Sequence, residues 1–403
     1  KLMLPLGISF YTFQSMGYVV DVCREKVSAE RNIGKIALFV SFFPQIIQGP
    51  IGIYEDLAGQ LFEPHKFDFT GFKHACELIL WGAFKKLVIA DRVVTVISAI
   101  TDRFDAFNGT ALTFGVLVYA LQLYADFSGG VDISRGVAQI FGIDMAENFR
   151  RPYFARTISE YWRRWHISLG AWMRDYVFYP FALTKPMAKL SKAAKARFGA
   201  DFGRALPAAL GNILVFLLVG VWHGATSNYI FWGLYNGLIL AFSALAEPAY
   251  KKWNTAHAAL SASKGFHVLR ILRTFIIVNI GWYFDRCVRA SDAFVMLYKT
   301  VCVPAFSQIS NGVLLTLGLS STDFMLLGVA TLVFILTKMI PGNPVTAHLS
   351  QRALNDPEVV AAAAADGAAA AMIEATGDKW SYYISAEEMQ THTEQTENAY
   401  VGV

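Results

Sequence analysis

Apolar residues are gathered into long runs, separated by shorter segments rich in charged side chains. An α-helix needs about 20 mostly apolar residues to cross the hydrocarbon core of a bilayer, so each long run predicts a membrane span. The predicted spans are residues 2–20, 111–125, 206–222, 228–246, 268–284 and 321–340. The pattern therefore predicts an all-α, polytopic membrane helix bundle.

Two apolar segments differ from a simple span. Residues 36–54 carry no charge but contain prolines, glutamines and glycines. Such a break at membrane depth is tolerated where protein or a cavity surrounds it, which predicts a broken or re-entrant helix. Residues 72–101 follow a helical pattern that charged residues interrupt between positions 85 and 92. This pattern predicts a helix that lies partly in the membrane interface.

The composition agrees with a membrane protein. Hydrophobic residues make up 55% of the chain and charged residues 16%, with a mean hydropathy of +0.39. A soluble domain has about a quarter charged residues. The 31 Phe, 17 Tyr and nine Trp suit aromatic belts at the two interfaces. The four cysteines have no CxxC spacing and no His at ligand spacing, so we expect neither a metal site nor a disulfide framework.

Residues 341–403 differ in composition from the preceding domain, residues 1–340. They hold nine acidic and two basic residues, with an Ala-rich run at 361–371, and we expect a mobile tail without a packed core. Residues 1–340 hold 33 basic and 22 acidic residues, a net charge of +11. In a membrane protein this excess belongs in cytoplasmic loops and against anionic lipid, and it does not indicate nucleic acid.

Two basic loops flank the predicted helical pair. Residues 185–204 carry six basic residues and one acid, and residues 247–273 carry five and one. The positive-inside rule places both loops on the cytoplasmic side of the plasma membrane. The turn at 224–228 is then expected toward the outer face, or at the floor of a cavity that opens there.

His223 is the leading candidate for chemistry. Tyrosines aside, it is the only titratable side chain between Arg204 and Glu247. An imidazole is costly to bury in such a setting, and histidine suits proton transfer near neutral pH. The preceding helix reaches roughly 25 Å, slightly less than the hydrocarbon core, so His223 is expected below the outer surface. A structural histidine at a helix turn is the alternative.

A second candidate cluster is the octapeptide Tyr-Trp-Arg-Arg-Trp-His-Ile-Ser. On a helix, Trp162, Trp165 and His166 share one face. Arg163 and Arg164 then point elsewhere, toward phosphate headgroups or an anionic ligand. An interfacial anchor helix with a merely structural His166 is the alternative.

The other ionisable candidates are weaker. Asp126 ends an apolar run, and we expect it to form a salt bridge with an arginine of residues 150–164. The remaining histidines flank a polar turn, a basic loop or the tail and are expected to be solvated. They are His65, His74, His257, His267, His348 and His392.

A series of motifs, in this order, resembles the membrane-bound O-acyltransferase (MBOAT) family. They are Leu-Pro-Leu-Gly-Ile-Ser-Phe-Tyr-Thr-Phe-Gln (4–14), Phe-Pro-Gln-Ile-Ile-Gln-Gly-Pro-Ile (43–51), Lys-Lys-Leu-Val-Ile-Ala-Asp (85–91), Tyr-Ala-Asp-Phe-Ser-Gly-Gly (124–130), Phe-Gly-Ile-Asp-Met-Ala-Glu-Asn-Phe-Arg-Arg-Pro-Tyr (141–153), Ser-Glu-Tyr-Trp-Arg-Arg-Trp-His-Ile-Ser-Leu (159–169) and Val-Trp-His-Gly-Ala (221–225). The resemblance covers roughly residues 1–340 and is greatest to the bacterial branch that holds alginate O-acetyltransferase and teichoic-acid D-alanyl transferase.

The resemblance implies a bundle of helices around a central tunnel, with further spans before residue 1. The family's catalytic histidine falls on His223 and its second important histidine on His166. Two positions depart from the family pattern. Gly130 stands where an aromatic residue is usual, and Arg135 where small or apolar residues are more common. Both departures concern the shape of the acceptor site.

The activity implied is transfer of an acetyl or D-alanyl group from a cytoplasmic thioester, acyl-CoA or an acyl carrier protein, with no bound cofactor. The acceptor is a hydroxyl on an extracytoplasmic polysaccharide or teichoic acid, or on a relay protein. His223 is expected to act as general base, while His166 lines the donor path and arginines at the cytoplasmic mouth hold the donor's phosphates. Trp222, Asn228 or backbone N–H groups near Gly224 are candidates to stabilise the oxyanion. The predicted substrate-binding residues are Trp165, Arg163, Arg164, Trp222, Asp126 and Asn228.

Two other classes of function are compatible with the residues. A proton-coupled transporter or flippase for a glycan or lipid would use His223 as relay and the broken segment 36–54 as gate. No internal repeat supports it. A structural subunit of an envelope polysaccharide machine would leave His223 inert.

Overall fold

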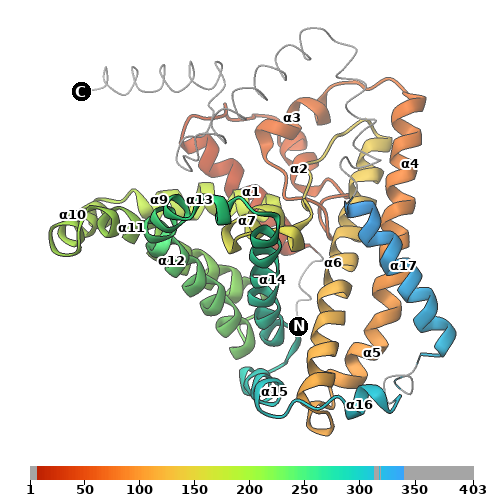
Figure 1. The fold of residues 1–403 in the computed structure, drawn as a ribbon. Coiled ribbons are helices and arrows are strands. Elements are labelled where there is room, and N and C mark those ends of the chain that lie inside the picture. Colours follow the sequence, from red (N-terminus) through yellow and green to blue (C-terminus); the bar gives the residue numbers. More distant parts are fainter. Residues whose placement is uncertain (1–6, 313–316, 318, 340–403) are drawn as a thin grey trace. The chain divides into compact units, whose positions relative to one another are not determined.

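The computed structural model describes residues 7–312, 317 and 319–339, and their regular secondary structure is helical. The described residues up to Ile335 belong to one compact unit. The first half holds α1 (Ile8–Cys23), α2 (Ile33–Ser41), α3 (Tyr54–Phe62), α4 (Phe69–Ala83), the π-helix η1 (Phe84–Ala90), α5 (Asp91–Thr101), η2 (Phe104–Ala106), α6 (Gly109–Ile140), η3 (Pro152–Phe154), α7 (Ile158–Arg164), α8 (Ile167–Met173), the π-helix η4 (Arg174–Phe178) and α9 (Tyr179–Ala182) (Figure 1). The second half holds α10 (Lys185–Phe198), α11 (Ala200–His223), α12 (Ser227–Ala256), α13 (Ala258–Ser261), α14 (Lys264–Arg286), α15 (Ala290–Cys302), α16 (Ser307–Ser310) and α17 (Ser321–Met339).

The all-α fold class predicted from the apolar runs is confirmed. Among the described residues, α6, α11 and α12 are long and apolar enough to cross a membrane. The other predicted spans form the shorter α1, the more charged α14 and α17. Residues 2–6 and 340 of those predictions, the further spans expected before residue 1, and the tail 341–403 lie outside the described residues. The central tunnel stays a prediction.

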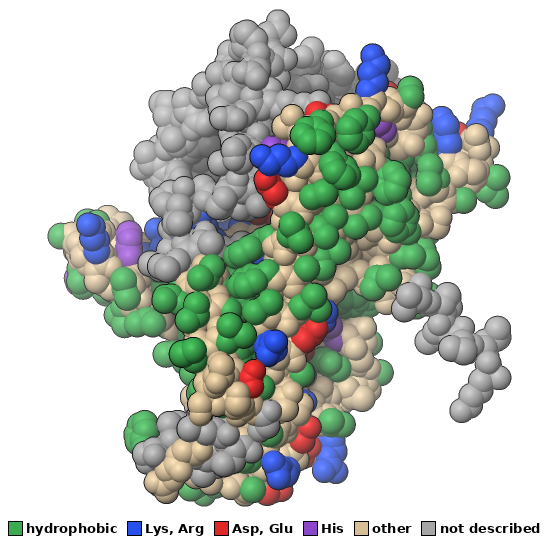
Figure 2. All heavy atoms as spheres, turned by 90° about the vertical axis from the view of Figure 1, so that its right-hand side faces the viewer, with side chains coloured by type: hydrophobic (Ala, Val, Ile, Leu, Met, Phe, Trp, Pro, Cys, Tyr) green, Lys and Arg blue, Asp and Glu red, His purple; other side chains and the backbone are tan. Residues whose placement is uncertain are grey.

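One face of the molecule is largely apolar. Figure 2 shows hydrophobic side chains gathered over the face formed by α4, α5 and α17. The exposed apolar side chains on these helices and on η1 include Phe72, Leu80, Leu87, Val94, Met325, Leu326, Val329, Leu332 and Val333. Such a continuous surface suits contact with lipid chains rather than water.

The segment 36–54 is broken, as its prolines and glycines predict. Helix α2 ends at Ser41, and turns fill the stretch until α3 begins at Tyr54. The loop is held to the rest of the protein by buried polar contacts. Gln45 accepts hydrogen bonds from the Gln14 side chain and from the Gly52 N–H, and the Ile51 N–H donates to Ser168 Oγ at 2.9 Å. The non-helical backbone is therefore satisfied by protein groups.

The end predicted for the span 111–125 is wrong, because α6 continues for fourteen residues past Asp126 to Ile140. The two acidic residues of α6 face lysines of η1 instead of ending the helix. Asp126 bonds to Lys86, and Asp132 lies 2.5 Å from the Lys85 ammonium. Each charge is paired within the protein, so the helix tolerates it at this depth.

Residues 72–101 were predicted to lie partly in the membrane interface, but Lys85 of this segment is buried inside the protein. Its side chain is 1% exposed and points at α6, where it also donates to Ser128 Oγ at 3.0 Å. The close approach of the two helices depends on glycines. A Cβ at Gly82 would lie 2.6 Å from the Gly129 carbonyl oxygen, and one at Gly129 would lie 2.8 Å from the Gly82 carbonyl oxygen. The lysines thus lie in a helix–helix contact.

The hairpin of α11 and α12 confirms the helical pair predicted at 206–246, and both helices extend farther into the basic loops. The two helices cross at glycines. A Cβ on Gly220 would lie 2.4 Å from the Tyr229 carbonyl oxygen and 3.2 Å from the Gly233 Cα. This contact, with the short loop 224–226, fixes His223 at the end of α11 beside the first turn of α12.

Candidate active site

The backbone breaks at His166, so the predicted shared helical face is wrong. Helix α7 ends at Arg164, Trp165 is extended, and His166 has φ 49° and ψ 56°, the left-handed region. Trp165 forms an isolated antiparallel bridge with Phe149. The Arg150 N–H donates to the Arg164 carbonyl at 2.9 Å. Pairing with the preceding loop therefore replaces the helix at this point, and nothing in the helical periodicity reveals it.

The His166 imidazole is buried against that loop. Its Nδ1 lies 3.3 Å from Asn148 Oδ1, an atom that also accepts the Ser168 N–H at 2.9 Å. Phe127 meets the ring edge to face, with centroids 4.8 Å apart. Burial, and secondarily the nearby His223, lowers the pKa of the His166 imidazole to about 3. His166 is therefore neutral at physiological pH.

His223 is accessible although aromatic rings surround it. Its residue is exposed, whereas ring centroids of Trp222, Trp232 and Tyr229 lie 4.7, 5.3 and 5.7 Å from its own. Tyr229 stacks on the imidazole at an interplanar angle of 23°, and Trp232 meets it edge to face. The rings fix the orientation of the imidazole while leaving it open to a reactant.

Tryptophans connect the surroundings of the two histidines. The ring centroids of Trp165, next to His166, and Trp282 lie 5.5 Å apart. The Trp282 centroid in turn lies 6.5 Å from that of Trp232, whose ring contacts His223. The indole N–H groups of Trp162, Trp222 and Trp232 are buried and have no hydrogen-bond partner among the described residues. A buried donor without a partner is costly and suits a ligand oxygen. The sequence pointed to Trp222 as a donor but missed Trp162 and Trp232.

Asn228 is the other side chain predicted to stabilise an oxyanion. It is buried, and its Nδ2 donates to the Phe284 carbonyl at 3.3 Å, whereas its Oδ1 has no partner within the described part of the chain. The amide thus offers an acceptor rather than its amino group. This geometry favours a hydroxyl ligand over an oxyanion at Asn228.

The arginines and Asp126 occupy different surroundings from those of the histidines. Arg164 bonds to Glu160 at 2.6 Å, whereas Arg163 is exposed and no ion pair joins it to another described residue. The predicted salt bridge of Asp126 exists, but its partner is Lys86 and not an arginine of residues 150–164. The error follows from the unbroken course of α6, which turns Asp126 toward η1.

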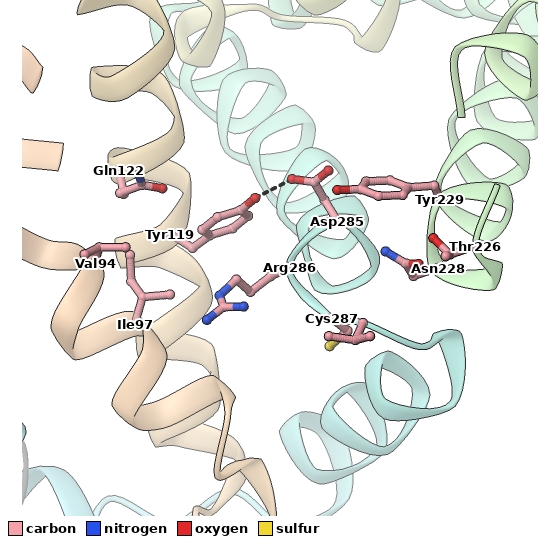
Figure 3. A pocket seen from close by; sticks show the side chains of 11 residues that line it. Val94, Ile97, Tyr119, Gln122, Thr226, Asn228, Tyr229, Asp285, Arg286 and Cys287 are labelled. Atoms are coloured by element: carbon pink, nitrogen blue, oxygen red, sulfur yellow. Dashed lines mark hydrogen bonds between the residues drawn. The ribbon is translucent and has the colours of Figure 1, made fainter. Parts of the chain in front are cut away.

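A pocket of about 540 Å³, which we call the polar pocket, lies between α5, α6, α12 and α14 (Figure 3). It is lined by Val94, Ile97, Tyr119, Gln122, Thr226, Asn228, Tyr229, Asp285, Arg286, Cys287 and Val288. The Tyr119 hydroxyl donates to Asp285 Oδ2 at 2.5 Å, and Figure 3 shows the Tyr229 hydroxyl pointing toward the same carboxylate. Because Tyr229 also stacks on His223, the pocket adjoins the imidazole.

The charges of this polar pocket are largely compensated. Arg286 donates to Asp102 at 2.8 Å and to Ser98 at 3.2 Å, so its cation already has an anionic partner. The Asp285 carboxylate can accept further hydrogen bonds besides the one from the Tyr119 hydroxyl. Carboxylate, phenol and amide groups together suit a ligand rich in hydroxyls. Sequence reasoning missed Tyr119 and Asp285 because α6, α12 and α14 bring them together from distant positions.

The ionisable and sulfur-bearing side chains of the described residues are dispersed. Within the described ranges, His, Cys, Asp and Glu side chains do not gather in a group of three that would hold an ion.

The whole chain was compared with known proteins. Residues 26–280 match the model of the MBOAT, membrane-bound O-acyltransferase family. The chain belongs to this family. Probable alginate O-acetylase AlgI of Pseudomonas aeruginosa is 31% identical over 377 residues, which are 94% of this chain and 66% of the relative.

Two further relatives of this MBOAT chain carry other names. Peptidoglycan O-acetyltransferase of Helicobacter pylori is 32% identical, covering 73% of this chain and 56% of the relative. Teichoic acid D-alanyltransferase of Bacillus subtilis is 28% identical, covering 69% and 67%. The chain spans between about half and two thirds of the length of the curated relatives that it matches.

Gly130 and Arg135, the two residues expected to depart from the family pattern, both lie against loops. A Cβ at Gly130 would lie 1.9 Å from Gln48 Oε1, so the Gln48 side chain occupies the space that a larger residue would need. Arg135 Nε donates to the Met145 carbonyl at 3.1 Å and is half-buried. Both residues contact loops of this MBOAT chain and do not line the polar pocket beside His223.

Proposed function

We propose that this protein is a membrane O-acyltransferase. It moves an acetyl or D-alanyl group from a cytoplasmic thioester to a hydroxyl of an extracytoplasmic cell-envelope polysaccharide or teichoic acid, or of a relay protein. The observation that carries the proposal is an accessible imidazole, His223, held by aromatic rings beside a polar pocket. Membership of the MBOAT family and the names of the relatives support the reaction class.

His223 acts as the general base in this reaction. The acceptor hydroxyl oxygen attacks the thioester carbonyl carbon while the imidazole takes the hydroxyl proton. The tetrahedral intermediate then collapses, the C–S bond breaks, and the imidazolium returns the proton to the leaving sulfur. The products are an ester on the acceptor and a free thiol, so His223 ends neutral and needs no cofactor.

Indole donors stabilise the oxyanion. The partnerless N–H groups of Trp222 and Trp232 belong to rings within 5.3 Å of the His223 ring, measured between centroids. Negative charge on the carbonyl oxygen strengthens hydrogen bonds from donors already fixed in place, which lowers the barrier. Of the backbone candidates near Gly224, the Gly224 N–H already donates to the Gly220 carbonyl at 3.1 Å.

The thioester donor reaches His223 by passing the buried His166. His166 and Trp165 line this path, with the thioester of acyl-CoA or an acyl carrier protein entering from the basic side. Arg163, which is exposed, binds the donor's phosphates at the mouth of the path together with Arg164. A neutral His166 suits an uncharged pantetheine arm because it adds no buried charge.

The acceptor enters from the opposite end. The polar pocket lies where α11 and α14 end and α12 begins, whereas α10 and the 247–273 loop lie at the other ends of these helices (Figure 1). By the positive-inside rule, we infer that the basic end faces the cytoplasmic side of the plasma membrane. The polar pocket then faces the outside, where Asp285 and Asn228 bind acceptor hydroxyls.

Mass spectrometry of envelope glycans tests the activity in cells. Cells that carry the gene are expected to show ester-linked acyl groups on one envelope polymer, and cells without it are expected to lack them. Envelope polymer without ester-linked acyl groups in both cell types would contradict the proposal. Loss of export with ester levels per polymer unchanged would instead indicate the transporter.

Asp285→Asn tests the polar pocket as acceptor site. The substitution keeps the shape but removes a charged hydrogen-bond acceptor, so we expect the acceptor KM to rise about tenfold or more while the donor KM stays unchanged. Steady-state kinetics with the acceptor identified from cells measures both constants. Asp105→Asn, at an exposed carboxylate of η2 outside the pocket lining, serves as control. An unchanged acceptor KM would remove Asp285 from the site.

A further inference from the structure

A second pocket lies at the basic end of the molecule. It has a volume of about 400 Å³ and is formed where α12 ends and α14 begins. Its lining residues are Ala246, Ala249, Tyr250, Trp253, Asn254, Phe266, Arg270 and Arg273. We call it the arginine pocket. None of its residues belongs to the polar pocket beside His223.

Within the described part of the chain, neither guanidinium group of the arginine pocket has an anionic partner. The Arg270 guanidinium lies over the Phe266 ring, 5.3 Å from its centroid, and contacts Asn254 Oδ1 at 3.5 Å. Arg273 donates to the Arg156 carbonyl at 3.0 Å. No carboxylate of a described residue lies within 4 Å of either group.

The surrounding charges do not compensate for these cations. Arg270 experiences the positive charges of Arg273 and Arg156, against the negative charge of Glu160. That carboxylate already binds Arg164 at 2.6 Å and the Arg156 backbone N–H at 2.6 Å. Several arginines thus share one carboxylate at this site, and a bound anion would offset their mutual repulsion.

We propose that the arginine pocket binds a phosphate ester that carries an apolar or aromatic extension. Arginine forks match phosphate oxygens with two hydrogen bonds, and the rings of Tyr250, Trp253 and Phe266 provide the adjoining apolar wall. A volume of about 400 Å³ accommodates such a group. The polar pocket has no comparable uncompensated cations, because Arg286 is paired with Asp102.

Two kinds of molecule can bring such a phosphate ester to the basic end. One is the phosphate of the thioester donor's pantetheine or nucleotide portion, and this arm rests on the proposed function. Arg273 contacts Arg156, two residues before α7, the helix that leads to His166, so the pocket borders the donor path. The other source is the headgroup of an anionic phospholipid, which gathers at basic interfaces of the cytoplasmic leaflet.

Binding of coenzyme A and of phospholipid to the purified full chain separates the sources. For the donor source, the Arg270→Gln/Arg273→Gln variant is expected to bind coenzyme A at least about tenfold more weakly by calorimetry, while its weaker binding of phosphate-free pantetheine is unchanged. For the lipid source, coenzyme A affinity is unchanged, but thermal stabilisation by phosphatidylglycerol over phosphatidylcholine is lost. Arg273→Gln alone, at an exposed residue, gives a smaller change in the same direction without perturbing the fold.

Lys189→Gln/Lys192→Gln is the matched control. It removes the same charge from exposed positions of α10 at the basic end and is expected to change neither measurement. If the double arginine variant keeps both its coenzyme A affinity and its phosphatidylglycerol response, or if the lysine control loses as much, the arginine pocket is not a phosphate site. These are binding measurements, so they stand or fall independently of whether the protein forms an ester.

Discussion

Replacing His223 by alanine is expected to lower the rate of acyl transfer by about 10²–10⁴-fold while the protein still folds and binds its donor. The acceptor hydroxyl loses the base that takes its proton, and the accessible side chain makes no hydrogen bond to another described residue. Initial rates of ester formation by the purified protein measure the effect. His223→Gln, which keeps a polar side chain of similar size without a base, is expected to lose as much.

His267→Ala is the matched control for this experiment. His267 lies on α14 toward the basic end, away from the polar pocket, and its loss is expected to leave the rate unchanged. If His223→Ala retains more than about a tenth of the wild-type rate, proton removal by this imidazole does not limit the reaction and the assigned role is wrong.

The buried ion pair between η1 and α6 is expected to dominate stability. Asp132→Asn removes the carboxylate that lies 2.5 Å from the buried Lys85 ammonium, and should lower the free energy of unfolding by about 3–5 kcal/mol. The measurement is the thermal unfolding midpoint of the detergent-solubilised protein. Removing both charges in Lys85→Met/Asp132→Leu is expected to restore most of the loss, because the buried ammonium is removed together with the carboxylate.

The neighbouring pair provides an internal control. Lys86 and Asp126 join the same two helices, but their side chains are 37% and 23% exposed. Asp126→Asn is therefore expected to cost less than about 1 kcal/mol. Equal destabilisation by Asp126→Asn and Asp132→Asn would show that burial does not set the strength of these pairs.

The sequence predicted the helices well where apolar runs were unbroken. The hairpin of α11 and α12 and the break in segment 36–54 follow from hydropathy, prolines and glycines. The end of α6 was not predictable in the same way. Charge at Asp126 indicates a helix end only when no partner is available, and the partner Lys86 is 40 positions away in the sequence.

The candidate site was predictable only in its motif residues. His223 and His166 stand out by chemistry and by the family resemblance, and in the structure packed tryptophan rings connect their surroundings. The left-handed backbone at His166 depends on pairing of Trp165 with Phe149, a tertiary contact that helical periodicity does not contain. Tyr119 and Asp285 lie in three-dimensional contact but 166 positions apart, so no local pattern marks them.

The arginine pocket shows a similar limit. The sequence drew attention to Arg163 and Arg164 because they are adjacent in a motif, yet Arg164 is paired with Glu160. Arg270 and Arg273, one turn apart on α14, are the cations that line a pocket. Their importance emerges only when the end of α12 packs beside them and supplies the aromatic wall.

The central claim is that this protein itself forms an ester on a hydroxyl. The most direct measurement uses the full chain reconstituted in vesicles, with a labelled acyl thioester outside the basic face and the acceptor on the other side. We expect labelled ester and free thiol to appear in equal amounts with the wild-type protein, and neither to appear at a comparable rate with His223→Ala. Passage of unmodified acceptor across the membrane, with no thiol released, would contradict the account.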